Sequence, residues 1–117
     1  MNQIISIDEG ETVIQEGAKD TRLFVLQSGE LEIRKDRKLV SVIDVPSSIV
    51  GEISVVLEKP RTCSVIAKTN CELALVGHSI NEIIESSPKL TKLIMQELAE
   101  RLEKTTSQFA SVAGNLL

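Results

Sequence analysis

Short runs of alternating or clustered β-branched residues fill the first two thirds of the chain, and Gly, Asp and Lys turns separate them. Such runs are typical of short antiparallel strands. They predict strands over residues 4–7, 12–15, 23–28, 30–34, 39–43, 62–67 and 72–76. Hairpin corners are expected at Ser28-Gly29 and at residues 35–37. Many short strands with glycine turns favour a sandwich or barrel, here an antiparallel β-roll of the jelly-roll type.

Helical patterns occupy the last third of the chain. Ser79 is placed to cap a short helix over residues 80–85, and Pro88 stands at the first position of a long helix that runs from about residue 89 to at least residue 112. The chain is therefore expected to be one domain, 1–117, with the β-roll in residues 1–78 and the helices in residues 79–117.

The long helix carries a stripe of residues spaced alternately three and four apart, which is the spacing of a coiled-coil seam. Its members are Met95, Leu98, Leu102, Thr105, Phe109, Val112 and Leu116. A stripe this narrow favours a facing helix, and so predicts a homodimer through the long helix. The alternative is that the stripe packs on the chain's own roll.

Composition narrows the class of protein. The chain has 117 residues, 42% hydrophobic and 26% charged, which is ordinary for one globular domain. No stretch reaches the roughly 20 apolar residues of a membrane span, and the start resembles no signal peptide, so a cytoplasmic protein without membrane contact is expected. Cys63 and Cys71 fall in strand-like runs and are expected to be free thiols.

Charge and residue types argue against two functions. A net charge of −4 and only two aromatic residues disfavour nucleic-acid contact by this chain. His78 is the only histidine, so the several ligands of a metal-dependent cupin cannot be assembled, and no serine or cysteine has a histidine partner at a recognisable spacing. The sequence therefore predicts neither an enzyme nor a bound metal or cofactor.

Residues 51–62, GEISVVLEKPRT, combine the groups needed to hold a small cyclic phosphate. Gly51 lets the backbone approach a ligand closely, and the apolar run after it predicts a short helical turn with free N–H groups. Arg61 offers a planar fork for phosphate oxygens, and Glu52 can accept a hydrogen bond from a sugar hydroxyl. The bland alternative is a plain turn into a helix, followed by a hairpin corner with a solvated arginine.

This stretch resembles the phosphate-binding cassette of the cyclic nucleotide-binding domain family, F-G-E-[LI]-[AS]-L-x5-R, with the same interval between the acidic residue and the arginine. Upstream, residues 10–17 and 23–29 resemble the family's glycine-punctuated strands. Two positions depart from the pattern, because Val50 replaces the usual aromatic residue and Ser47 replaces a loop glycine.

The resemblance implies a cassette over residues 51–64 that binds cAMP or cGMP. Arg61 would contact the exocyclic phosphate oxygens and Glu52 the ribose 2′-hydroxyl. The other candidate ligand-binding residues in the cassette are Gly51, Ile53, Ser54, Thr62 and Cys63. In cGMP-selective members a threonine after the arginine contacts guanine, which Thr62 could do, although bacterial cAMP regulators also carry Ser or Thr there.

Residues 97–106 resemble bacterial catabolite-activator-like regulators, in which a Thr-Ser pair meets the base, one hydroxyl from each subunit. Thr105 and Thr106 occupy those positions and favour cAMP over cGMP. The expected function is a sensor that couples ligand binding to rearrangement of the helix. The alternative within the fold is a degenerate roll used for docking or dimerisation without nucleotide. The sequence is compatible both with a stand-alone sensor and with a fragment of a longer protein.

Overall fold

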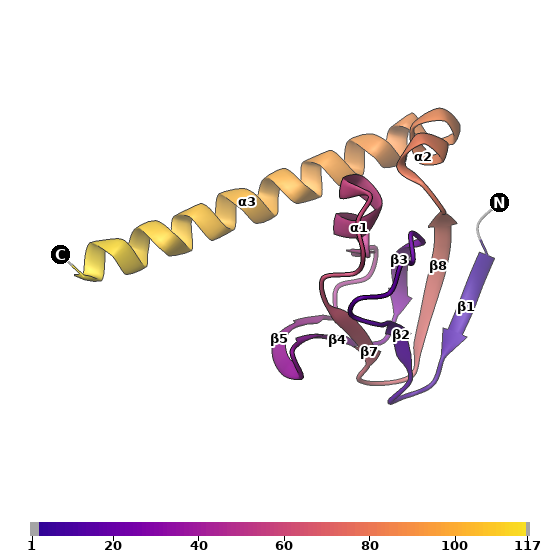
Figure 1. Cartoon of the computed structure of the whole chain (residues 1–117), viewed down its shortest axis with the longest axis horizontal. Coiled ribbons are helices and arrows are strands. Elements are labelled where there is room, and N and C mark those ends of the chain that lie inside the picture. The colour runs from indigo at the N-terminus through magenta and orange to yellow at the C-terminus, as the bar shows by residue number, and fades with distance from the viewer. Residues whose placement is uncertain (1–2, 117) are drawn as a thin grey trace.

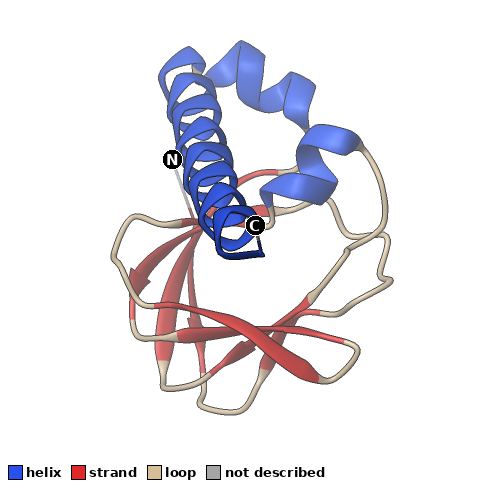
Figure 2. Ribbon diagram, turned by 90° about the vertical axis from the view of Figure 1, so that its left-hand side faces the viewer, coloured by secondary structure: helices blue, strands red, loops and turns tan. Residues whose placement is uncertain are grey.

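Two four-stranded antiparallel sheets face each other and form the roll in this computed structural model, which describes residues 3–116 and the side chains of residues 3–114 (Figures 1 and 2). The strands are β1 Gln3–Ile7, β2 Thr12–Ile14, β3 Leu23–Ser28, β4 Leu31–Lys35, β5 Lys38–Ile43, β6 Ile49–Val50, β7 Ser64–Ala67 and β8 Cys71–Gly77. Their order is β1-β8-β3-β6 in one sheet and β2-β7-β4-β5 in the other. This arrangement is the predicted antiparallel jelly roll.

Alternation along the strands builds the core between the sheets. In β7, Val65 and Ala67 are buried while the two residues between and before them are half-buried. Leu26, Leu31 and Leu73 are fully buried in the same cluster. Each sheet thus contributes its inward face to one apolar layer, as the period of two requires.

The two predicted corners differ in what they connect. At residues 35–37 the structure confirms a hairpin between β4 and β5, with Asp36 and Arg37 both at positive φ (51° and 67°) in its two-residue loop. The prediction for Ser28-Gly29 was wrong, because β3 and β4 belong to different sheets and do not pair. Gly29 instead turns the chain between the sheets at φ 93°, where an added Cβ would lie 2.4 Å from the Asn70 carbonyl oxygen.

The strands on either side of the cassette differ from the predicted ones. Residues 49 and 50 form β6, which pairs antiparallel with β3 and was not predicted. The strand expected from residue 62 begins only at Ser64, because Thr62 and Cys63 lie in a bend. The free thiol of Cys71 is buried in β8, whereas that of Cys63 is half-buried outside any strand.

The described part of the chain also has three helices: α1 Glu52–Leu57, α2 Ile80–Ser86 and α3 Pro88–Leu116. Ser79 caps α2 by accepting a hydrogen bond from the Glu82 amide at 3.1 Å, as predicted. Ile83 of α2 and Ile94 of α3 are buried with Leu23 in a second apolar cluster. Within the described residues, no helix is both long and apolar enough to cross a membrane.

Only the first half of α3 packs on the rest of the chain. Ile94 is buried and Leu98 is half-buried against the second cluster, but the described residues after position 98 are exposed apart from Ala113. Figure 1 shows this part of the helix projecting away from the roll. The alternative that the whole stripe packs on the chain's own roll therefore does not hold, because among its described members only Leu98 packs there.

Candidate functional site

The cassette begins at Gly51, which connects β6 to α1 in a conformation that favours glycine. Its φ is 92°, and an added Cβ would lie 2.7 Å from Nη1 of Arg61 and 3.1 Å from the Arg22 carbonyl oxygen. Both the backbone conformation and the missing side chain are therefore required here. The close approach brings the Gly51 carbonyl within hydrogen-bond distance of the arginine.

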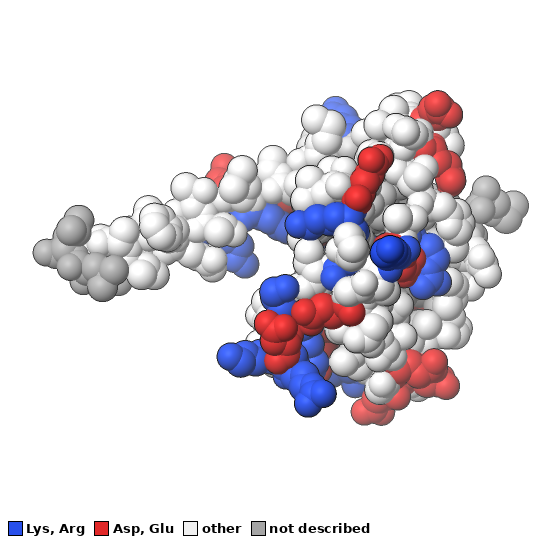
Figure 3. Space-filling view, viewed as in Figure 1, with Lys and Arg blue, Asp and Glu red and all other residues white. Residues whose placement is uncertain are grey.

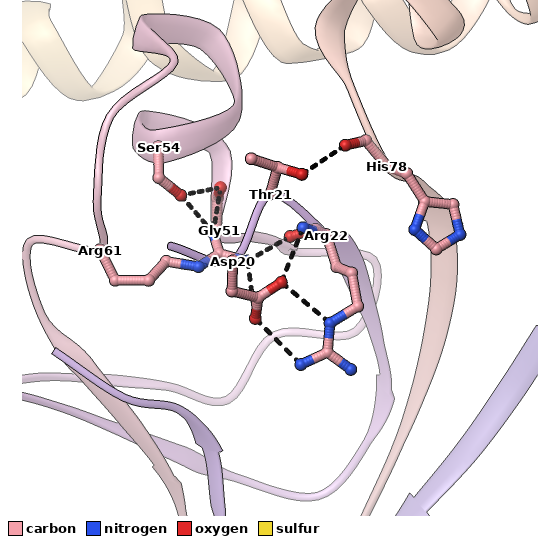
Figure 4. A network of polar contacts seen from close by, with 7 residues as sticks. All are labelled: Asp20, Thr21, Arg22, Gly51, Ser54, Arg61 and His78. Atoms are coloured by element: carbon pink, nitrogen blue, oxygen red, sulfur yellow. Dashed lines mark hydrogen bonds and ion pairs between the residues drawn. The ribbon is translucent and has the colours of Figure 1, made fainter. Parts of the chain in front are cut away.

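Arg61 is only 4% exposed, and its guanidinium is directed into the cassette (Figure 4). Nη1 donates to the Gly51 carbonyl oxygen at 2.8 Å and to the hydroxyl of Ser54. Nη2 donates to the Arg22 carbonyl oxygen at 2.6 Å and lies 3.3 Å from a carboxylate oxygen of Asp20. Both terminal amino groups are thus engaged by groups of the protein.

The Nε atom of Arg61 differs from these terminal groups. It is buried and has no hydrogen-bond partner among the described residues. Buried N–H groups are normally paired, and an unpaired one beside a full positive charge is a favourable place for an anionic oxygen. Nε is therefore the one donor of this arginine that no described protein group satisfies, in place of the open fork that the sequence suggested.

Asp20, in the loop between β2 and β3, pairs with two arginines. Arg22 holds its carboxylate through Nε and Nη2, both at 2.9 Å, and through the backbone amide at 3.0 Å. Burial by itself raises the pKa of Asp20, but the hydrogen bonds from Arg22 and the charges of Arg61 and Arg22 outweigh it and hold the pKa well below its ordinary value. Asp20 is therefore ionised at neutral pH.

Glu52, the first residue of α1, is 6% exposed and faces α3 rather than solvent. Nη1 of Arg101 on α3 pairs with its Oε1. Nη2 of the same arginine donates to Glu97 at 2.6 Å and to the Ile49 carbonyl oxygen at 3.2 Å. A buried carboxylate needs such a partner. Arg101 therefore ties the cassette to the long helix.

The structure brings four of the predicted site residues together, namely Gly51, Glu52, Ser54 and Arg61. The side chain of Ile53 is exposed, and the half-buried Thr62 and Cys63 follow the arginine in the bend. Thr105 and Thr106 are exposed on α3. Thr105 lies one helical turn beyond Arg101, about 6 Å along the axis and on the same side of the helix.

Sequence reasoning missed Asp20 and Arg101. The signal for Arg101 was its spacing of four residues after Glu97 and four before Thr105, which places all three on one helix face. For Asp20, the local signal was the Asp-x-Arg pattern alone, and nothing in it indicates contact with a residue 41 positions later in the chain.

Comparisons with known proteins identify the family of this chain. The sequence model of the cyclic nucleotide-binding domain matches residues 4–86. A cGMP-dependent protein kinase of Toxoplasma gondii is 35% identical over 102 residues, which are 86% of this chain and 10% of the kinase. A CRP-like cAMP-activated global transcriptional regulator of Mycobacterium tuberculosis is 27% identical over 115 residues, which are 94% of this chain and 51% of the regulator.

A solved structure shares the fold over almost the whole chain. The crystal structure of Thermus thermophilus catabolite activator protein superposes with a TM-score of 0.77 at 21% identity, covering 96% of this chain and 55% of that one. This chain belongs to the cyclic nucleotide-binding domain family. It spans about half of the bacterial regulator and a tenth of the kinase to which it is similar.

Proposed function

We propose that this chain is a regulatory domain that binds a cyclic nucleotide, cAMP in preference to cGMP, without catalysing a reaction. The observation that carries the proposal is the buried guanidinium of Arg61, which lies beside Gly51. Its Nε atom has no hydrogen-bond partner among the described residues. An exocyclic oxygen of a cyclic phosphate would satisfy that donor and neutralise the charge.

The ribose would be held next to the phosphate by Glu52. Arg101 pairs with Oε1 of this carboxylate, and a carboxylate has about four lone-pair sites, so acceptor capacity is left for a 2′-hydroxyl. The arginine holds this carboxylate in a fixed orientation beside α3. A nucleotide at this position would therefore contact groups that already connect the cassette to the helix.

The base would meet α3 at Thr105 and Thr106. In a parallel two-stranded coil with Leu102 and Phe109 at a positions, Arg101 is a g residue and Thr106 an e residue, and these positions face each other across the interface. Thr106 of the partner subunit would then lie near Arg101, and the site would take one hydroxyl from each subunit. The expectation of adenine as the base rests on the resemblance of residues 97–106 to bacterial cAMP regulators, because hydroxyl groups can bond to either purine.

The exposed stripe on α3 supports a homodimer. Met95 is 67% exposed, Leu102 68%, Phe109 74% and Val112 58%. Figure 3 shows few charged side chains on the projecting part of the helix. The side chain of Leu116, the last member of the predicted seam, lies outside the described residues. Four large apolar residues at heptad spacing are normally covered by a second helix.

Ligand binding would act by shifting populations. If one position of α3 relative to the cassette binds nucleotide better than another, the nucleotide favours that position by its difference in affinity. The Arg101–Glu52 pair and the threonines one turn later are the groups that would sense the difference. No bond in the nucleotide need be broken for this signal.

A docking module without nucleotide is the competing function, and one observation favours it. Both terminal amino groups of Arg61 already bind protein groups, so the arginine is stable in an empty site. Such an arginine could be kept for folding alone. Glu52 is likewise already paired.

Isothermal titration calorimetry of the purified chain with cAMP, cGMP and 5′-AMP distinguishes a nucleotide-binding domain from a docking module. Saturable heat with cAMP, weaker binding of cGMP and no binding of the ring-opened 5′-AMP would support the proposal. Tighter binding of cGMP would overturn the ligand assignment but not the class of function. Absence of heat with all three would favour the docking module.

A further inference from the structure

Asp20 lies between two guanidinium groups of unequal exposure (Figure 4). The side chain of Arg61 is 2% exposed, and that of Arg22 is 42% exposed. Arg22 makes three hydrogen bonds to the carboxylate, whereas Arg61 has one contact with it at 3.3 Å. The carboxylate is therefore shared, and the more exposed arginine holds it more firmly.

A buried guanidinium needs a negative charge nearby, because an uncompensated charge is costly in a site of low dielectric constant. Among the described residues, Asp20 is the one acidic side chain that pairs with Arg61. Its depressed pKa means that it supplies a full negative charge at neutral pH. Asp20 thus compensates Arg61 while no phosphate is present.

A cyclic phosphate beside Arg61 would bring a second negative charge to the same guanidinium. Repulsion between the phosphate and Asp20 would weaken binding, since like charges that share a partner disfavour each other. Arg22 offers Asp20 an alternative counterion that needs no new contacts. The repulsion is therefore smallest when Asp20 moves toward Arg22.

We propose that Asp20 sets the affinity of the site for the cyclic phosphate as an exchangeable counterion, which neutralises Arg61 in the empty site and passes to Arg22 when the phosphate arrives. Asp20 is a positioning residue in this scheme, because it acts through Arg61 and does not touch the nucleotide. The inference rests on the proposed function and deepens it. It gives Arg22, which lies outside the cassette motif, a part in the same site.

Two substitutions should change affinity in opposite directions. Asp20→Asn keeps the shape of the side chain but removes the competing charge, so the phosphate becomes the counterion of Arg61 and the affinity for cAMP should rise about tenfold. Arg22→Met keeps an apolar stem over Phe24 but releases Asp20 to Arg61, so the affinity should fall about tenfold. Asp20→Asn should also lower the melting temperature of the nucleotide-free protein, since Arg61 loses its counterion.

The experiment is a titration of the parent, Asp20→Asn, Arg22→Met and Asp44→Asn with cAMP, with melting temperatures measured with and without nucleotide. Asp44 is exposed and outside the cassette, so Asp44→Asn controls for the change in net charge alone. We expect Asp20→Asn to bind cAMP more tightly than the parent and Arg22→Met to bind it more weakly. Asp44→Asn should bind like the parent.

Other outcomes overturn different statements. Weaker or unchanged binding by Asp20→Asn, while the parent binds cAMP, would show that Asp20 only supports the loop and would overturn this inference alone. Equal gains in Asp20→Asn and Asp44→Asn would also overturn it, because net charge would then explain the effect. A parent chain that binds no nucleotide would overturn the proposed function and this inference together.

Discussion

The guanidinium of Arg101 on α3 pairs with the carboxylate of Glu52 at the start of α1, across 49 positions of sequence. Together with the hydrogen bond from Arg101 to the Ile49 carbonyl oxygen, this pair links the long helix to the rest of the domain at the point where the helix leaves the roll. One partner is buried and the other is partly exposed, at 8% and 43% of their side-chain surface. The pair can therefore be tested by its effect on stability as well as on ligand binding.

Arg101→Ala should lower the free energy of unfolding by about 1–3 kcal/mol, because it leaves the Glu52 carboxylate buried without its partner. Urea unfolding measures this loss. Lys104→Ala, which removes an exposed charge one turn further along α3, is the control and should change stability by less than about 0.5 kcal/mol. In a Glu52→Gln background the cost of Arg101→Ala should shrink, and an equal cost in both backgrounds would contradict the pairing.

Arg61→Lys should weaken cAMP binding by about 10² or more, although the charge is kept. A lysine cannot reproduce the planar set of donors, and the carbonyl oxygens of Gly51 and Arg22 would lose partners, so stability should also fall. Calorimetric titration and thermal melting give the two effects separately. The matched control is Arg37→Lys on the β4–β5 hairpin. A variant at position 61 that titrates like the parent would remove this residue from the site.

Leu102→Lys should convert the chain to monomers at concentrations where the parent is a dimer. The substitution would bury an ammonium group between two α3 helices, which costs several kcal/mol. Light scattering coupled to gel filtration measures the mass. Leu93 is also exposed on α3, at 50%, but lies off the heptad positions, so Leu93→Lys should leave the mass unchanged. Loss of the dimer in both variants would point to another face of the helix.

Ser47→Gly should raise the free energy of unfolding by about 1 kcal/mol. Ser47 has a φ of 72°, a conformation that is unfavourable for residues with a Cβ, at the position where the related pattern has glycine. Ser41→Gly in the extended strand β5 is the opposite control and should lower stability by about 0.5–1 kcal/mol. Urea unfolding of both variants decides the matter, and destabilisation by Ser47→Gly would be inconsistent with a strained loop.

The stability that Asp20 provides should depend on pH in one direction. Its pKa in the folded protein lies below the unfolded value of about 3.9, so the unfolded state binds more protons between the two values. The difference in unfolding free energy between the parent and Asp20→Asn should therefore be constant from about pH 5 to 8 and should shrink as the pH falls below about 4. A difference that grows on acidification would refute the ion pairs of Asp20.

The sequence predicted where the chain forms strands better than which strands pair. Turn residues such as Ser28 and Gly29 have the same local chemistry whether they close a hairpin or carry the chain from one sheet to the other. Pairing depends on which faces are buried together, and β3 finds its partners in β6 and β8 instead. β6 has two residues, too few for any periodic pattern to show.

The cassette was predictable because its chemistry lies within twelve consecutive residues, with Gly51, Glu52 and Arg61 at fixed spacings. The surroundings of these residues were not. Arg101 in sequence looks like half of a surface pair with Glu97, and only the packing of α3 over α1 directs it to Glu52. Asp20 reaches Arg61 because the loop after β2 runs beside the end of the cassette, held there by backbone hydrogen bonds between Gly17 or Ala18 and Arg61.

Because α3 packs on the roll only near its start, a small tilt of the packed segment would be amplified along the projecting half of the helix (Figure 1). Fifteen residues of the described helix follow Arg101, and they extend over roughly 22 Å along its axis. A tilt of about 10° in the packed segment would move the far end by about 4 Å, which is roughly three quarters of the helix pitch. Sub-ångström changes around Glu52 and Arg101 would therefore displace the far end of α3 by several ångströms. A displacement of that size is large enough to exchange one set of side-chain contacts for another.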